Sequence, residues 1–177
     1  LRCFVGPPLR ESFPQFGVPE DRVEEAITVF RSRYLTVGKF ENVPYDGIQP
    51  LLQTLKERGH RLYVATSKPE STAVEILNKF ELSPYFTRIC GASMDSGRDS
   101  KEAVIAYLLE LEGRAQKTVM VGDTAFDVIG AAAHQIPTIG VSWGYGDMDE
   151  MLAAGACAIA HTPEELGALL LQEAEKA

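Results

Sequence analysis

The chain contains little cysteine, little tryptophan and no long apolar run. Its 177 residues include three cysteines and one tryptophan. Cys3, Cys90 and Cys157 are odd in number, widely separated and outside any Cys-x-x-Cys pair. This pattern argues against a disulfide framework or a zinc site, and it favours a reducing cytoplasm. No apolar run approaches the roughly 20 residues that a membrane-spanning helix needs, so we expect no membrane association.

Positive charge is also scarce. Seventeen Lys and Arg stand against 25 Asp and Glu, which gives a net charge of −8 and a pI near 4.9. That balance argues against nucleic acid or an anionic membrane as the main partner, because both repel an acidic surface. It still allows a small, locally positive pocket for phosphate. The length suffices for one domain with a core and a small appendage.

From about residue 46 onward, short apolar runs alternate with segments of helical periodicity. Such alternation is typical of crossover units, so we predict the α/β class: a Rossmann-like parallel sheet with helices on both faces. Functional side chains in such sheets gather at the carboxyl ends of the strands. The predicted strands cover residues 61–65, 88–91, 118–121, 137–142 and 157–160.

Residues 1–45 differ from the rest because they contain no run that resembles a strand. Val23, Ile27, Phe30 and Tyr34 instead form the apolar stripe of one amphipathic helix. We therefore predict a helical appendage over residues 1–45 and an α/β body over 46–177.

Two carboxylates follow the predicted strand 118–121. Asp123 comes directly after Gly122 at the strand end, Thr124 can cap the next helix, and Asp127 lies four residues after Asp123. Two such acids can face one spot and bind a hard cation such as Mg²⁺. The alternative is that both aspartates only cap the helix or face solvent.

Candidate phosphate ligands follow two other elements. Thr66 and Ser67 come after the predicted strand 61–65, where they either bind a phosphate oxygen or cap the following helix. Lys101 lies in the first turn of another predicted helix, where the helix dipole disfavours a cation, so an anionic partner is expected unless the side chain is merely solvated. Lys68 competes with Lys101 for this role.

In this order, the motifs resemble those of the haloacid dehalogenase superfamily, and specifically its phosphoglycolate phosphatase and 5′-nucleotidase branch. Residues 64–69 resemble the second motif of that family, Lys101 the third, and residues 121–127 the fourth. The resemblance implies that Thr66 and Ser67 bind phosphate, that Lys101 neutralises it, and that Asp123 and Asp127 are catalytic and hold Mg²⁺. Residues 5–13 are similar to part of the family's helical cap, which makes Arg10 a candidate substrate ligand unless it is solvated or ion-paired.

One motif of the family is missing. The first motif, Asp-x-Asp-Gly-Thr, supplies the aspartate nucleophile at the end of the first strand. Here the Asp-x-Asp string at residues 147–149 follows no apolar strand. We therefore expect residues 1–45 to be a partial cap, residues 46–177 to be a core without its first strand, and the sequence to be an N-terminally incomplete version of a longer protein.

The resemblance implies a Mg²⁺-dependent phosphomonoester hydrolase that acts on a small phosphorylated metabolite through an aspartyl-phosphate. The printed sequence is then expected to be inactive, because it lacks the nucleophile. The alternatives are a 5′-nucleotidase or sugar phosphatase, a receiver-like domain that binds Mg²⁺ and phosphate without turnover, or a protein-interaction module on the same scaffold.

Overall fold

The computed structural model describes residues 9–93, 97–115 and 117–175. The chain divides into two compact units, Leu1–Val43 and Pro44–Ala177. The predicted boundary after residue 45 lies two residues further along the chain.

The N-terminal unit is helical. It contains α1 (Leu9–Gln15), η2 (Glu20–Arg22), α2 (Val23–Thr36) and η3 (Gly38–Phe40). Val23 and Ile27 of α2 are buried, and the ring of Phe30 stacks on Tyr34 with centroids 5.6 Å apart. Phe13 of α1 meets Phe30 edge-on at 6.3 Å. The predicted apolar stripe therefore exists, and it packs α2 against α1.

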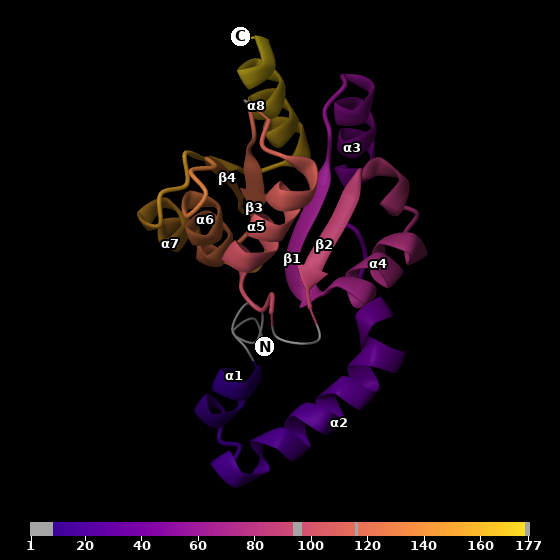
Figure 1. Cartoon of the computed structure of the whole chain (residues 1–177), viewed down its shortest axis with the longest axis vertical. Helices are drawn as coiled ribbons and strands as arrows, with labels where there is room; N and C mark the ends of the chain where they lie inside the picture. The colour runs from indigo at the N-terminus through magenta and orange to yellow at the C-terminus, as the bar shows by residue number, and fades with distance from the viewer. Residues whose placement is uncertain (1–8, 94–96, 116, 176–177) are drawn as a thin grey trace. The chain divides into compact units, whose positions relative to one another are not determined.

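The C-terminal unit alternates helices and strands, as the sequence predicts (Figure 1). Every strand pair in it is parallel, so the α/β class is confirmed. The elements are, in order, α3 (Ile48–Glu57), β1 (Tyr63–Pro69), α4 (Glu70–Lys79), η4 (Ser83–Tyr85), β2 (Arg88–Ala92), α5 (Lys101–Glu112), β3 (Met120–Gly122), α6 (Ala125–Ala132), β4 (Thr138–Val141), α7 (Met148–Ala153), β5 (Ala158–Ala160) and α8 (Pro163–Glu175).

The five strands found among the described residues form two sheets. β1 pairs with β2, and β3, β4 and β5 form the second sheet in that order. The sheet is therefore divided between β1 and β3. All residues of β4, which is central in its sheet, are buried, whereas Val121 of β3 is 37% exposed. Within the described chain, β1 and β3 each keep one edge without a paired strand.

A shared core joins the two sheets. Ile105 of α5, Ala131 of α6 and Ile136 form a buried cluster. Ala65 of β1 and Met120 of β3 both pack against it, so apolar contact rather than a ladder connects the strands. A second cluster lies over β4 and β5, and Trp143 packs against it. Trp143 therefore has a packing role in this unit.

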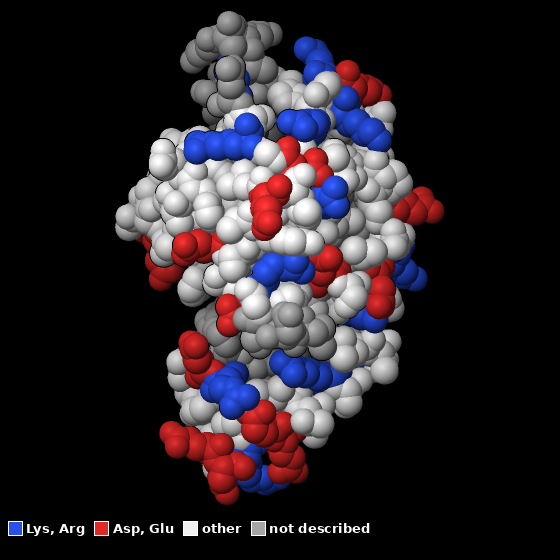
Figure 2. Space-filling view, viewed as in Figure 1, with Lys and Arg blue, Asp and Glu red and all other residues white. Residues whose placement is uncertain are grey.

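Charged side chains are interspersed on the surface. On the face in Figure 2, acidic and basic residues lie among one another in both units. In the described part of the chain, no helix combines the length and apolar character required to cross a bilayer.

A polar network ties the end of α5 to the starts of β1 and β2. Arg88 Nε donates to Glu112 Oε1 at 2.6 Å, and Tyr63 Oη donates to Glu112 Oε2 at 3.3 Å. The hydrogen bond from Arg88, helped by its charge, lowers the pKa of Glu112. Burial is the main cause that raises the pKa of Tyr63.

The Glu112 network predicts a pH-dependent contribution to stability. A carboxyl whose folded-state pKa is depressed stabilises the fold above its unfolded pKa, and the stabilisation is lost as the pH falls through the folded pKa. Glu112→Gln should therefore lower Tm at pH 7 and have a smaller effect at pH 3, as measured by circular dichroism. Glu110→Gln, an exposed position on the same helix, is the matched control. A Tm difference for Glu112→Gln that is the same at both pH values would contradict this account.

Candidate active site

Lys101 links β1 to α6 at the carboxyl edge of the strands. It is the first residue of α5, which Ser100 caps by accepting a hydrogen bond from the Ala103 N–H at 3.2 Å. Lys101 Nζ donates to the carbonyl oxygen of Ala65 in β1 at 2.8 Å. It also forms an ion pair with Asp127 Oδ1 at 2.8 Å, and both side chains are largely buried. The predicted catalytic residues Lys101 and Asp127 are thus brought into direct contact.

Asp127 folds back onto the start of its own helix. Its Oδ2 accepts hydrogen bonds from the Asp123 N–H at 3.1 Å, the Thr124 N–H at 3.0 Å and Thr124 Oγ1 at 3.0 Å. Thr124 is the N-cap residue of α6, so the capping prediction is confirmed. A Cβ at Gly122 would lie 2.3 Å from Asp127 Cβ, and this close approach explains why glycine ends β3.

The two aspartates therefore occupy different environments. Asp127 is 5% exposed, and both of its oxygens already have partners. Asp123 Oδ2 accepts from the Tyr145 N–H at 2.9 Å, while Oδ1 has no hydrogen bond within the described residues. Asp123 can thus offer a carboxylate oxygen directly, whereas both oxygens of Asp127 are already engaged with protein donors.

Asp123 and Asp127 could supply only some of the ligands that a Mg²⁺ ion needs. No group of three or more His, Cys, Asp or Glu side chains that could hold a metal occurs in the described ranges. Mg²⁺ is commonly bound through one or two carboxylates while water fills its other positions. Asp123 beside the buried Asp127 fits that description, and further oxygen ligands must come from water, substrate or another segment.

Thr66 and Ser67 lie within β1 rather than at a helix start. The strand continues to Pro69, with an irregular register between Ala65 and Pro69. Pro69 is the N-cap residue of α4, so the alternative in which Thr66 or Ser67 caps this helix is wrong. Thr66 Oγ1 instead accepts from the Lys68 N–H at 3.2 Å, and Ser67 is exposed. Both hydroxyls follow Ala65, whose carbonyl holds Lys101.

Arg10 belongs to the N-terminal unit. Its Nη1 lies 2.7 Å from Glu24 Oε1, and both side chains are mostly exposed. The ion-paired alternative for Arg10 therefore describes its state in this structure. The adjoining residues 5–8 of the predicted cap loop lie outside the described ranges.

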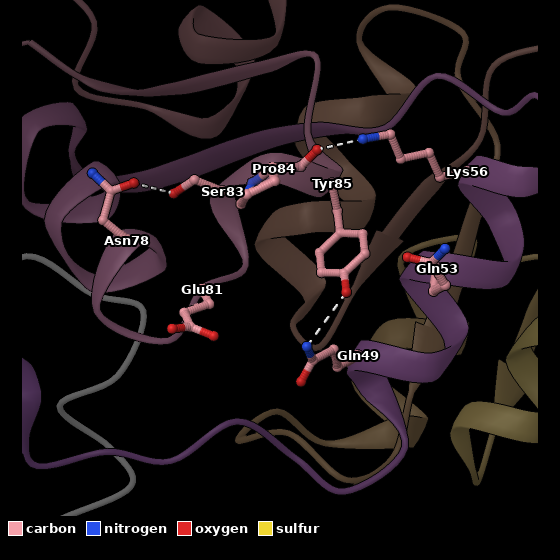
Figure 3. A pocket seen from close by; sticks show the side chains of 8 residues that line it. All are labelled: Gln49, Gln53, Lys56, Asn78, Glu81, Ser83, Pro84 and Tyr85. Atoms are coloured by element: carbon pink, nitrogen blue, oxygen red, sulfur yellow. Dashed lines mark hydrogen bonds between the residues drawn. The ribbon is translucent and has the colours of Figure 1, made fainter.

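A polar pocket of about 580 Å³ lies elsewhere, between α3 and the α4–η4 segment (Figure 3). Its polar groups pair with one another: Lys56 Nζ donates to the Pro84 carbonyl at 2.7 Å, and Gln49 Nε2 donates to Tyr85 Oη at 3.3 Å. None of the predicted site residues lines it. The pocket therefore adds nothing to the chemistry around Lys101.

From the sequence, Trp143 and Tyr145 in the loop after β4 could rim the site, but the contact of this loop with Asp123 was not predicted. The N–H groups of Tyr145 and Gly146 donate to Asp123 Oδ2 and to the Asp123 carbonyl, at 2.9 and 3.0 Å. The available signal was the pair of glycines around Tyr145 directly after a predicted strand. Only the structure shows that this loop contacts Asp123.

Comparison with known proteins gives one consistent family. A sequence profile described as haloacid dehalogenase-like hydrolase matches residues 1–141. A 5′-nucleotidase from Pseudomonas aeruginosa is 43% identical over 155 residues, which cover 86% of this chain and 70% of that protein. A phosphoglycolate phosphatase from Agrobacterium fabrum is 32% identical over 132 residues, covering 74% of this chain and 57% of that protein.

Two further matches extend the comparison. The tyrosine-protein kinase PtkA of Mycobacterium tuberculosis is 44% identical over 158 residues, which cover 89% of this chain and 54% of that protein. The chain thus spans little more than half of some relatives. The crystal structure of a predicted phosphatase from Clostridium acetobutylicum superimposes with a TM-score of 0.88 at 41% identity, over 97% of this chain and 80% of that chain.

The ion pair between Lys101 and Asp127 predicts a large cost for removing one partner. Lys101→Met leaves the buried Asp127 carboxylate without its counter-charge, so we expect a loss of about 3 kcal/mol in the free energy of unfolding, measured by urea denaturation. Asp127→Asn in the Lys101→Met background should recover part of that loss, because it removes the orphaned charge.

Lys79→Met on the exposed face of α4 is the matched control and should change stability by less than about 0.5 kcal/mol. Equal effects of the two lysine substitutions would show that the ion pair does not stabilise the fold.

Proposed function

Because the chain belongs to the haloacid dehalogenase-like hydrolase family, we propose that it forms the larger part of a Mg²⁺-dependent phosphomonoester hydrolase for small phosphorylated metabolites. The observation that carries this proposal is the convergence of Lys101, Asp127 and Asp123 at the carboxyl edge of β1 and β3. The relatives named as a 5′-nucleotidase and a phosphoglycolate phosphatase support the same reaction class.

In this proposal each residue has a separate task. Thr66 and Ser67 donate hydroxyl hydrogen bonds to the phosphoryl oxygens, next to the Ala65 carbonyl that holds Lys101. Lys101 offsets the negative charge of the phosphoryl oxygens, and the ion pair with Asp127 fixes the Lys101 ammonium group in place. Asp123 would hold Mg²⁺, which supplies further charge neutralisation when bound. Asp127 orients Asp123 by accepting its backbone N–H.

The nucleophile in this proposal is an aspartate from a segment outside the printed sequence. Its carboxylate attacks phosphorus, the ester P–O bond breaks, and the leaving alcohol takes up a proton. Water then hydrolyses the aspartyl-phosphate to release phosphate. The division of the sheet supports this assignment, because the unpaired edges of β1 and β3 leave a place where a strand could deliver such an aspartate.

This proposal predicts that the 177-residue chain alone turns over no phosphomonoester. With p-nitrophenyl phosphate and Mg²⁺, its rate should equal the protein-free rate, and Asp123→Asn should not change it. The same chain extended by its upstream coding sequence should be active and should lose at least about 100-fold of its rate on Asp123→Asn. Phosphate release measured on both proteins provides the test.

Two results would count against the proposal. Mg²⁺-dependent turnover by the 177-residue chain that disappears in Asp123→Asn would show that no external nucleophile is needed. An extended chain that is folded but inactive toward p-nitrophenyl phosphate, nucleoside monophosphates and phosphoglycolate would favour a binding or interaction module instead.

A second candidate function is phosphoryl transfer to protein tyrosine. The similarity to the tyrosine-protein kinase PtkA favours it, and the same cluster of Lys101, Asp123 and Asp127 could handle a transferred phosphoryl group. Incubating the extended chain with ATP labelled at the γ-phosphate separates the two. Label on tyrosine indicates a kinase, whereas label released only as inorganic phosphate indicates a hydrolase.

A further inference from the structure

We propose that the loop of residues 142–147, between β4 and α7, is a positioning element that holds the carboxylate of Asp123 in its metal-binding orientation. The inference rests on the proposed function in one respect, namely that Asp123 is a metal ligand. The loop acts through main-chain N–H groups and through Gly144 and Gly146, which have no side chain to collide with Asp123. None of its residues therefore needs to touch the reacting atoms.

The loop contacts both the side chain and the main chain of Asp123. The Tyr145 N–H donates to Asp123 Oδ2 at 2.9 Å. The Gly146 N–H donates to the Asp123 carbonyl oxygen at 3.0 Å. Hydrogen bonds to an ionised acceptor are about twice as strong as neutral ones, so the first contact fixes the rotation of the carboxylate. Oδ1 is then the oxygen left for a cation.

The fit between the loop and Asp123 allows no additional carbon atom. A Cβ at Gly144 would lie 2.2 Å from Asp123 Cβ, and a Cβ at Gly146 would lie 2.1 Å from the Asp123 carbonyl oxygen. Real Cβ atoms do not approach other atoms this closely. The two glycines are therefore a requirement of the contact with Asp123, rather than a sign of a flexible loop.

One end of the loop is anchored to the second sheet, and the other end caps α7. The Ser142 N–H donates to the Ala160 carbonyl of β5 at 3.0 Å, and Ser142 Oγ lies 3.1 Å from His161 Nδ1. At the other end, Asp147 Oδ1 accepts from the N–H groups of Asp149 and Glu150 and so caps α7.

The packing of Trp143 on the core cluster of β4 and β5 adds a third anchor. The loop is thus fixed independently of Asp123. It can impose an orientation on the aspartate instead of following it.

Two substitutions of Tyr145 separate the contribution of its main-chain N–H from that of its side chain. Tyr145→Pro removes the N–H that reaches Asp123, whereas Tyr145→Ala keeps it and removes only a side chain that is 52% exposed. Removing a partner of a metal ligand usually weakens metal binding about 10- to 100-fold, so we expect that loss for Tyr145→Pro and less than about a twofold change for Tyr145→Ala. Mg²⁺ titration of the chain extended by its upstream coding sequence, followed by isothermal calorimetry, gives the affinities.

A second measurement needs no metal. Amide hydrogen exchange followed by NMR should show protection at Tyr145 and Gly146 in the metal-free chain. Asp123→Ala removes the acceptor for Tyr145 but keeps the carbonyl for Gly146. We therefore expect the Tyr145 amide to exchange at least tenfold faster while Gly146 stays protected. This contrast also serves as the folding control within one variant.

The outcomes distinguish the two proposals. If the extended chain binds no Mg²⁺ while the Tyr145 amide is protected, the metal role of Asp123 in the proposed function is contradicted, but the contact between the loop and Asp123 stands. Equal Mg²⁺ affinities for Tyr145→Pro and the parent chain would overturn the loop inference, and so would a Tyr145 amide that is insensitive to Asp123→Ala.

Discussion

The contact between Lys101 and Asp127 is the interaction on which the rest of the site depends. Two opposite charges lie 2.8 Å apart with side chains that are 14% and 7% exposed. Burying such a pair costs solvation free energy, and the cost is offset only where the remaining donors and acceptors are also satisfied. The Ala65 carbonyl does this for Lys101, and three donors do it for the other oxygen of Asp127. The ion pair thereby connects Ala65 of β1 to the starts of α5 and α6.

This arrangement explains how a divided sheet remains one unit. β1 and β3 exchange no ladder hydrogen bonds, so their relative position rests on the cluster of Ile105, Ala131 and Ile136 and on the polar bridge through Lys101. Apolar burial favours proximity but is not directional. The hydrogen bonds of Lys101 are directional. Thr66 follows Ala65, whose carbonyl accepts from Lys101, and the Asp123 N–H donates to Asp127, so Thr66 and Asp123 both lie close to the Lys101–Asp127 ion pair.

Much of this architecture was predictable, because local patterns determine it. Alternating apolar runs and helical stripes specified the order of the elements, and the Gly-Asp-Thr string after an apolar run specified the cap of α6. The separate environments of Asp123 and Asp127 were not predictable, since they depend on which donors lie nearby in space. The extension of β1 through Thr66 was missed because an irregular register, rather than composition, continues the strand. The contact of the loop of residues 142–147 with Asp123 was not predicted, because it is made by backbone N–H groups, and the glycines beside Tyr145 do not identify the partner of those groups.

The charges of the site also explain why the proposed reaction requires a divalent cation. The opposite charges of Lys101 and Asp127 cancel, so the carboxylate of Asp123 gives the cluster of these three residues a net negative charge. An aspartate nucleophile would add another, and a phosphomonoester brings up to two more near neutral pH. Assembling these groups in a partly buried site would be strongly unfavourable without added positive charge. In the proposed function, a Mg²⁺ ion at Asp123 would supply this charge where the negative charges meet. Because Asp127 is already engaged with Lys101, the orientation of Asp123 would determine where such an ion binds.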